Sequence, residues 1–136
     1  MDEKMKVLVV EPMKAPYEKE IKHDLETLQK EVGGYIEAVY PFEDEVGIIC
    51  NEEGKLIGLH PNRALYDGDG KIYDVISGTF LVVGLGDEDF TSLNDKQIDK
   101  FSEMFKSPEI FRNTPSGIMA IKIETAASLR DDKEER

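Results

Sequence analysis

The sequence has one cysteine, two histidines and no tryptophan among its 136 residues. A single thiol, Cys50, cannot form an intramolecular disulfide and is typical of a protein from a reducing compartment. The two histidines, His23 and His60, lie far from Cys50 in the sequence and show no paired spacing with it. Zinc sites need such paired ligands. These shortages argue against a disulfide-stapled fold and against a zinc centre.

Long apolar runs are also missing. No run approaches the roughly 18 residues that a membrane-spanning helix needs. The apolar stretch at residues 5–10 comes soon after the acidic residues Asp2 and Glu3 and is too short for the core of a signal peptide. We therefore expect a cytoplasmic protein that has no membrane partner.

Positive charge is scarce, with 17 Lys and Arg against 29 Asp and Glu, and the net charge is −12. The basic residues are scattered among carboxylates instead of forming a stripe, and net negative charge opposes the approach of nucleic acid. We expect no direct nucleic-acid partner. The acidity suits an ordinary soluble surface, and it equally suits a protein that imitates DNA.

What the sequence does contain is a series of short strand patterns and two helix patterns. Asp24 is a good helix N-cap, and Gly33-Gly34 ends the helix that it starts. Asn94 and Gln97 have the spacing of a capping box at the start of a second helix, which ends near residues 107–108. Gly54 is expected to supply a positive φ in a hairpin loop. Residues 61–65 are interpreted as a short helical turn or an ordered loop. The predicted strands are residues 5–10, 17–21, 35–40, 46–50, 55–59, 72–76 and 79–83.

This order of elements predicts an α+β fold, a mostly antiparallel sheet packed by two helices. The chain length suits a single domain, because two domains would each have too little core. We place the domain at residues 1–112. Residues 113–136 end in a charged run and are expected to form a C-terminal extension that is partly solvated or disordered.

Two motifs resemble ligand loops but lack essential parts. Gly84-Leu85-Gly86 has no third glycine, and the three carboxylates of residues 87–89 would repel a pyrophosphate. The turn at residues 67–70 resembles a calcium loop, yet Leu65 and Ile76 would fill its first and twelfth positions and cannot bind a metal ion. We expect neither a cofactor nor a metal.

Nucleophilic catalysis by this chain would use Cys50 together with His60. Cys50 ends an apolar strand, where a free cysteine commonly acts as a small hydrophobic residue. His60 would approach Cys50 if residues 46–59 formed a hairpin, but no third group that would orient the pair is indicated. An enzyme remains an open alternative, and no catalytic residue is assigned.

The stretch 51–66 is the richest in functional groups. An arginine fork binds carboxylate or phosphate groups, and a tyrosine ring offers a stacking face. The competing interpretation is that Asn62 caps a turn while Arg63 pairs with a nearby carboxylate. The candidate ligand-binding residues are Asn51, Lys55, His60, Asn62, Arg63 and Tyr66.

Several segments in fixed order resemble a bacterial and phage family known as domain of unknown function thirty-eight forty-six. They are residues 32–37, 50–56, 58–59, 62–65, 74–80 and 89–93. The resemblance covers about residues 5 to 105, and the segment after Phe111 lies outside it. It implies a mobile-element or gut-bacterial setting and carries over no catalytic residue.

From these observations we expect a small binding module for an anionic or nucleotide-like ligand. The alternative is an acidic protein–protein inhibitor or DNA mimic that acts on a host protein. The sequence leaves the oligomeric state open.

Overall fold

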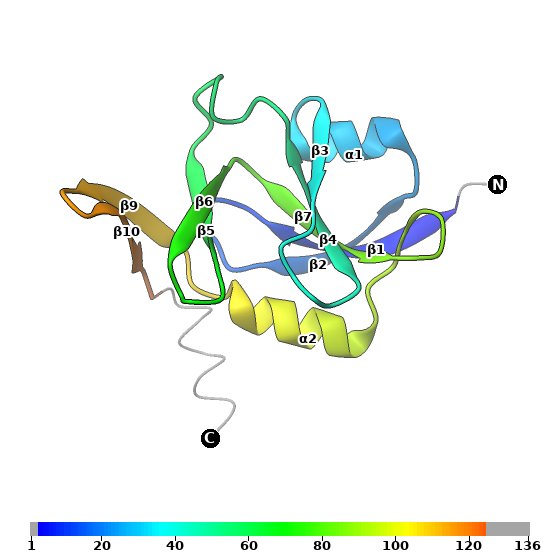
Figure 1. Ribbon diagram of the computed structural model, residues 1–136. Coiled ribbons are helices and arrows are strands. Elements are labelled where there is room, and N and C mark those ends of the chain that lie inside the picture. The colour runs from blue at the N-terminus through cyan, green and yellow to red at the C-terminus, as the bar shows by residue number, and fades with distance from the viewer. Residues whose placement is uncertain (1–2, 125–136) are drawn as a thin grey trace.

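A six-stranded antiparallel sheet forms the centre of the molecule, as seen in a computed structural model that describes residues 3–124 (Figure 1). Each strand pairs antiparallel with its neighbours. In spatial order the sheet contains β2 (Tyr17–Lys22), β1 (Lys4–Val10), β7 (Phe80–Leu85), β4 (Val46–Asn51) and β3 (Ile36–Val39), and β8 (Phe90–Thr91) pairs with β7.

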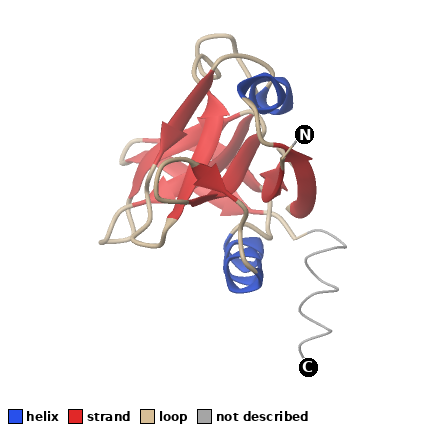
Figure 2. Ribbon diagram, turned by 90° about the vertical axis from the view of Figure 1, so that its right-hand side faces the viewer, coloured by secondary structure: helices blue, strands red, loops and turns tan. Residues whose placement is uncertain are grey.

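Two helices cover opposite faces of this sheet, α1 (Leu25–Val32) above and α2 (Asp95–Met104) below (Figures 1 and 2). The arrangement follows from the period-two alternation of side chains along buried strands. Val7 and Val9 pack with Leu28 of α1. Leu8 and Val10, the alternate residues of the same strand, belong to the cluster on the α2 side. Strand β1 therefore contributes alternate side chains to the hydrophobic clusters on both faces of the sheet.

Both predicted helix starts are confirmed. The Asp24 carboxylate accepts a hydrogen bond from the Thr27 amide at 2.7 Å, and Gly33 ends α1 in the left-handed conformation with φ 79°. Asn94 and Gln97 form the reciprocal hydrogen bonds of a capping box at the start of α2. Local side-chain chemistry thus fixes both helices where the sequence placed them.

Two hairpins lie outside the central sheet. The first pairs β5 (Pro61–Tyr66) with β6 (Ile72–Ser77), and the second pairs β9 (Glu109–Thr114) with β10 (Gly117–Lys122). Leu65 and Ile76 of the first hairpin are buried in the core cluster on the α2 side. The β5–β6 hairpin therefore forms part of the layer below the sheet.

The structure corrects the prediction for residues 55–65. Residues 55–58 are turn and not strand, and the segment expected as a turn or loop is strand β5. The positive φ lies at Gly58 (75°) and not at Gly54. A Cβ on Gly54 would come within 2.8 Å of the Ser77 carbonyl oxygen. Gly54 is therefore needed for the close approach of two backbones.

The fold class is confirmed as a single α+β domain with a mostly antiparallel sheet. The expected boundary after residue 112 falls inside β9, so residues 113–122 belong to the second hairpin. The part of the predicted extension at residues 125–136 lies outside the described residues.

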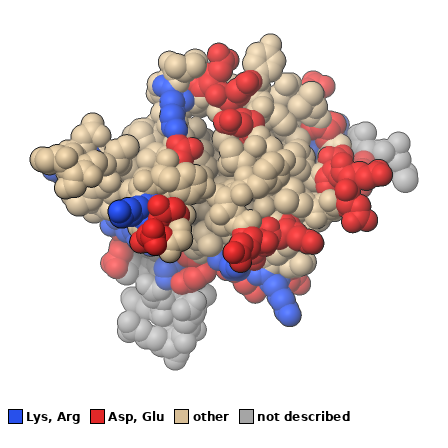
Figure 3. Space-filling view, in the orientation of Figure 1, with Lys and Arg blue, Asp and Glu red and all other residues tan. Residues whose placement is uncertain are grey.

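Charged side chains are spread over the surface. On the face shown in Figure 3, carboxylates gather at several separate places, with lysine and arginine side chains beside some of them. Within residues 3–124, no helix has the length and apolar character needed to cross a bilayer.

Candidate functional site

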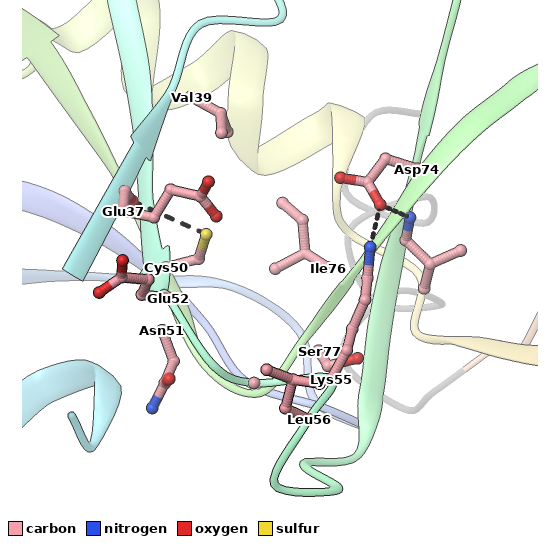
Figure 4. Close-up of a pocket in the computed structure, with 12 residues that line it drawn as sticks. Glu37, Val39, Cys50, Asn51, Glu52, Lys55, Leu56, Asp74, Ile76 and Ser77 are labelled. Carbon is pink, nitrogen blue, oxygen red and sulfur yellow. Dashed lines mark hydrogen bonds and ion pairs between the residues drawn. The ribbon is translucent and has the colours of Figure 1, made fainter. Parts of the chain in front are cut away.

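A cavity of about 400 Å³ opens between the central sheet and the β5–β6 hairpin, and we call it the polar cavity (Figure 4). Strands β3 and β4 form one wall, and β6 with the turn after β4 forms the other. Figure 4 shows the side chains of Cys50 and Ile76 facing the space between these walls. The lining residues are Glu37, Val39, Cys50, Asn51, Glu52, Gly54, Lys55, Leu56, Asp74, Val75, Ile76 and Ser77.

The residue that shapes the cavity is Asn51 at the end of β4. Its side-chain amide donates to the Val32 carbonyl at 3.2 Å, and its side-chain oxygen accepts from the Glu53 amide at 2.8 Å. Asn51 is buried, with 7% of its surface exposed. It therefore fixes the end of α1 to the turn that carries Lys55 and Leu56, and its role is to position that turn.

Negative charge dominates the rim of the polar cavity. Glu37, Glu52 and Asp74 contribute three carboxylates against the single ammonium group of Lys55. Lys55 already pairs with Asp74, whose Oδ1 also accepts from the Val75 amide at 2.8 Å. The one cation of the rim is therefore engaged, and a net negative field remains.

Burial and these neighbouring charges shift the pKa of the Cys50 thiol. The pKa of Cys50 is raised to about 11, mainly by burial and also by the charges of Glu37 and Asp74, while the charge of Lys55 acts to lower it. The sulfur lies 3.7 Å from the Glu37 carbonyl oxygen, to which it donates a weak hydrogen bond. The thiol is protonated at neutral pH, whereas nucleophilic catalysis needs a thiolate. His60 is exposed and does not line the cavity.

Asn62 and Arg63 lie in the interior, with no exposed surface. The Arg63 guanidinium donates to the Phe105 carbonyl from Nε at 3.2 Å and from Nη2 at 2.8 Å. It also donates to the Lys14 carbonyl (2.8 Å) and to the Asn62 side-chain oxygen (2.7 Å). Asn62 in turn donates to the carbonyls of Val10 and Gly78. Both residues hold the fold together, so we place them outside the binding surface.

Of the six candidate residues, the structure brings only Asn51 and Lys55 into the polar cavity. Tyr66 is partly exposed and lines a different cavity, beside Glu109. Glu37 and Asp74 could not be predicted as site residues, because the sequence contains 29 acidic residues and nothing in it distinguishes these two from the others. The structure brings β3 and β6 to opposite walls of the polar cavity, so that both residues line the same space.

The two motifs that resemble ligand loops are structural turns. The Asp67 carboxylate accepts from the amides of Asp69 and Lys71, both at 2.9 Å, and Gly70 has φ 79°. A Cβ on Gly84 would lie 2.6 Å from the Ser92 carbonyl oxygen, so this glycine allows the chain after β8 to approach β7. Across the described part of the chain, no group of three or more His, Cys, Asp or Glu side chains is arranged to hold a metal ion.

The sequence model of a family described as "Domain of unknown function (DUF3846)" matches residues 5–106. This range runs from β1 through α2 and includes every residue that lines the polar cavity. No curated protein and no solved structure matches the chain.

Proposed function

The chain belongs to the DUF3846 family, and we propose that it is a small-molecule binding module whose polar cavity takes a small organic cation. The observation that carries the proposal is the charge of the rim, where three carboxylates surround one ammonium group that is already paired. The size of the cavity, about 400 Å³, falls in the range of about 300–1,000 Å³ that is typical of ligand pockets.

The charge of the cavity selects the ligand class. An anion or a nucleotide phosphate would meet repulsion from Glu37 and Glu52, and the arginine expected to bind it, Arg63, is buried and fully engaged. An amine or guanidine group would instead form charge-assisted hydrogen bonds with these carboxylates. We therefore replace the anionic ligand expected from the sequence with a cationic one.

The apolar part of the cavity lining indicates which chemical group accompanies the cationic group of the ligand. Val39 and Ile76 present apolar surface there, and Leu56 stands at the rim with 87% of its side chain exposed. Apolar walls with a few placed polar groups are typical of small-molecule sites. A short alkyl chain that ends in an amine fits both parts of the cavity.

Three compounds with the same four-carbon chain test the proposal, namely diaminobutane, butanediol and succinate. Isothermal titration calorimetry of the intact protein at low salt compares their affinities. We expect diaminobutane to bind at least about tenfold more tightly than butanediol, the ratio that one charge-assisted hydrogen bond supplies. Succinate is expected not to bind. Equal affinities, or preference for succinate, would overturn the proposal.

A second candidate function is an acidic protein–protein inhibitor or DNA mimic that acts on a basic host protein. The observation in its favour is the set of separate carboxylate clusters in Figure 3, together with the net charge of −12. Exposed acids occupy turns around the sheet, at Glu43, Glu45, Asp87, Glu88 and Asp89. We place such a role in the cytoplasm of a bacterial or phage-infected cell.

The second candidate predicts salt-sensitive capture of a purified lysine-rich DNA-binding protein. Capture by immobilised protein is expected at about 0.1 M salt and is lost at about 1 M, because the Debye length falls from about 10 Å to about 3 Å. Capture that survives high salt, or no capture at low salt, would contradict this role.

A further inference from the structure

A second cavity, of about 310 Å³, lies on the other side of the β5–β6 hairpin, between β5, the end of α2 and the β9–β10 hairpin. We call it the apolar cavity. It shares no lining residue with the polar cavity. Its lining residues are Pro41, Phe42, Ala64, Leu65, Tyr66, Met104, Phe105, Glu109 and Lys122.

The walls of the apolar cavity are mostly hydrocarbon and aromatic. Phe42 and Phe105 meet edge to face, with ring centroids 6.4 Å apart. Leu65 is buried behind them, and Tyr66 and Met104 remain 44% and 42% exposed at the rim. Such a surface binds the apolar body of a ligand, and a thioether beside aromatic rings adapts to its shape.

A buried carboxylate stands among these apolar walls. Glu109 is 4% exposed, and its Oε1 accepts a hydrogen bond from the Ala64 amide at 3.0 Å. Burial raises the pKa of Glu109, although the Ala64 amide and the charges of Arg63 and Lys122 act to lower it. A carboxylate in apolar surroundings is costly unless it is paired. Glu109 is thus suited to receive a cationic group inside the cavity.

Lys122 places the opposite charge next to Glu109. The two residues are direct partners across the β9–β10 pair. Directly opposed side chains in an antiparallel pair have Cβ atoms about 4.5–5.5 Å apart and lie on the same face. Lys122 is exposed, so the cavity has an acidic group in its interior and a basic group toward solvent.

We propose that the apolar cavity is a second ligand site, and that it takes an α-amino acid with an apolar side chain. The ammonium group of such a ligand meets the Glu109 carboxylate, its carboxylate meets Lys122, and its side chain packs on Phe42 and Phe105. The ammonium and carboxylate groups of an α-amino acid are bonded to the same carbon. This close spacing of opposite charges matches the opposite charges of Glu109 and Lys122 at directly paired cross-strand positions.

The β9–β10 hairpin supplies both charged groups, and it follows the last residue of the family match, Lys106. The polar cavity lies wholly within that match. The apolar cavity is therefore completed by a part of the chain that the family model does not include. Its ligand is independent of the cation proposed for the polar cavity.

The test uses wild-type protein, so that no variant needs to fold. The probes are L-phenylalanine, phenethylamine, which lacks the carboxylate, and phenylpropionate, which lacks the ammonium group. NMR titration follows the Met104 methyl and Tyr66 ring signals at the rim. We expect L-phenylalanine to bind at least about tenfold more tightly than either analogue, since each loses one charge-assisted contact. Equal affinities for the three, or no shift at Met104 and Tyr66, would overturn the proposal.

Two matched variants add a second readout. Lys122→Gln removes the partner of the ligand carboxylate, and Lys96→Gln removes an exposed lysine from the first turns of α2, outside the cavity. We expect Lys122→Gln to reduce the preference for L-phenylalanine over phenethylamine to about twofold or less, and Lys96→Gln to preserve it. An unchanged preference in Lys122→Gln would contradict the proposed contact.

Discussion

The Arg63 side chain connects several separate segments of the chain. Its guanidinium joins β5 to the loop after β1, through Lys14, and to the end of α2, through Phe105. Burial lowers the pKa of Arg63 to about 10, which still leaves it charged at neutral pH. A buried cation is tolerated only where its donors are satisfied, and here carbonyl and amide oxygens satisfy them.

Replacement of Arg63 by lysine tests this role. Lysine lacks the planar fork, so it cannot reach Phe105, Lys14 and Asn62 at once. We expect the free energy of unfolding to fall by about 3 kcal/mol, the scale of a disrupted buried charge. Urea denaturation measures it. Arg112→Lys on exposed β9 is the matched control and is expected to change stability by less than about 0.5 kcal/mol. Similar small effects for both variants would contradict the role of Arg63.

Cys50 predicts a pH dependence of stability. The pKa of its thiol is about 11 in the folded chain, against an ordinary value of 9.0. A raised pKa stabilises the folded protein fully below the lower value, and this contribution disappears as the pH rises through the higher one. Between pH 9 and about 11 we therefore expect wild type to lose about 2 kcal/mol more than Cys50→Ala. Parallel curves of unfolding free energy against pH would contradict the burial of this thiol.

The roles of some single residues could be predicted from the sequence, and the roles of others could not. The N-caps Asp24 and Asn94 could be predicted because capping depends on residues within three positions of one another. The role of Arg63 could not, because its partners are 42 and 49 positions away. The sequence predicts Arg63 as a ligand contact in a turn or loop, whereas the structure places it in a strand whose central residues are buried.

At the scale of elements, helix α2 gives the clearest local test. The Asn94 side chain accepts from the Gln97 amide at 2.8 Å, and Gln97 returns a bond to the Asn94 amide. Asn94→Ala is expected to cost about 1 kcal/mol of unfolding free energy, as measured by thermal or urea denaturation. Asn113→Ala, at an exposed position of β9, serves as the control with little expected change. Equal losses in both variants would show that the cap contributes nothing specific.

The β5–β6 hairpin shows which features of the secondary structure could not be predicted from the sequence. Residues 55–59 have strand-like composition, but residues 55–58 form a turn, and the Leu59 amide donates to the Gly54 carbonyl at 2.9 Å. Strand β5 begins with Pro61 and pairs with β6 outside the central sheet, which alternation alone does not reveal. Strand patterns could be read from the sequence, whereas strand partners depend on contacts between distant segments.

At the scale of the whole molecule, the β5–β6 hairpin packs against both the central sheet and the second hairpin, and it contributes lining residues to the polar cavity and to the apolar cavity. The α+β class and the two helices could be predicted, because apolar strands with period-two faces require a covering layer on each side. The candidate site could be predicted only in Asn51 and Lys55. The carboxylates that determine its charge are brought together by tertiary structure.

The central claim is that the charge of the polar cavity binds a small organic cation, and one comparison tests it most directly. Calorimetry measures diaminobutane affinity for Glu37→Gln, at the cavity rim, and for Glu18→Gln, an exposed glutamate on β2 at the opposite edge of the sheet. Both variants remove one negative charge from a strand. We predict that Glu37→Gln weakens binding by about tenfold and Glu18→Gln by less than about twofold. Equal effects of the two variants, or full affinity in Glu37→Gln, would contradict the account.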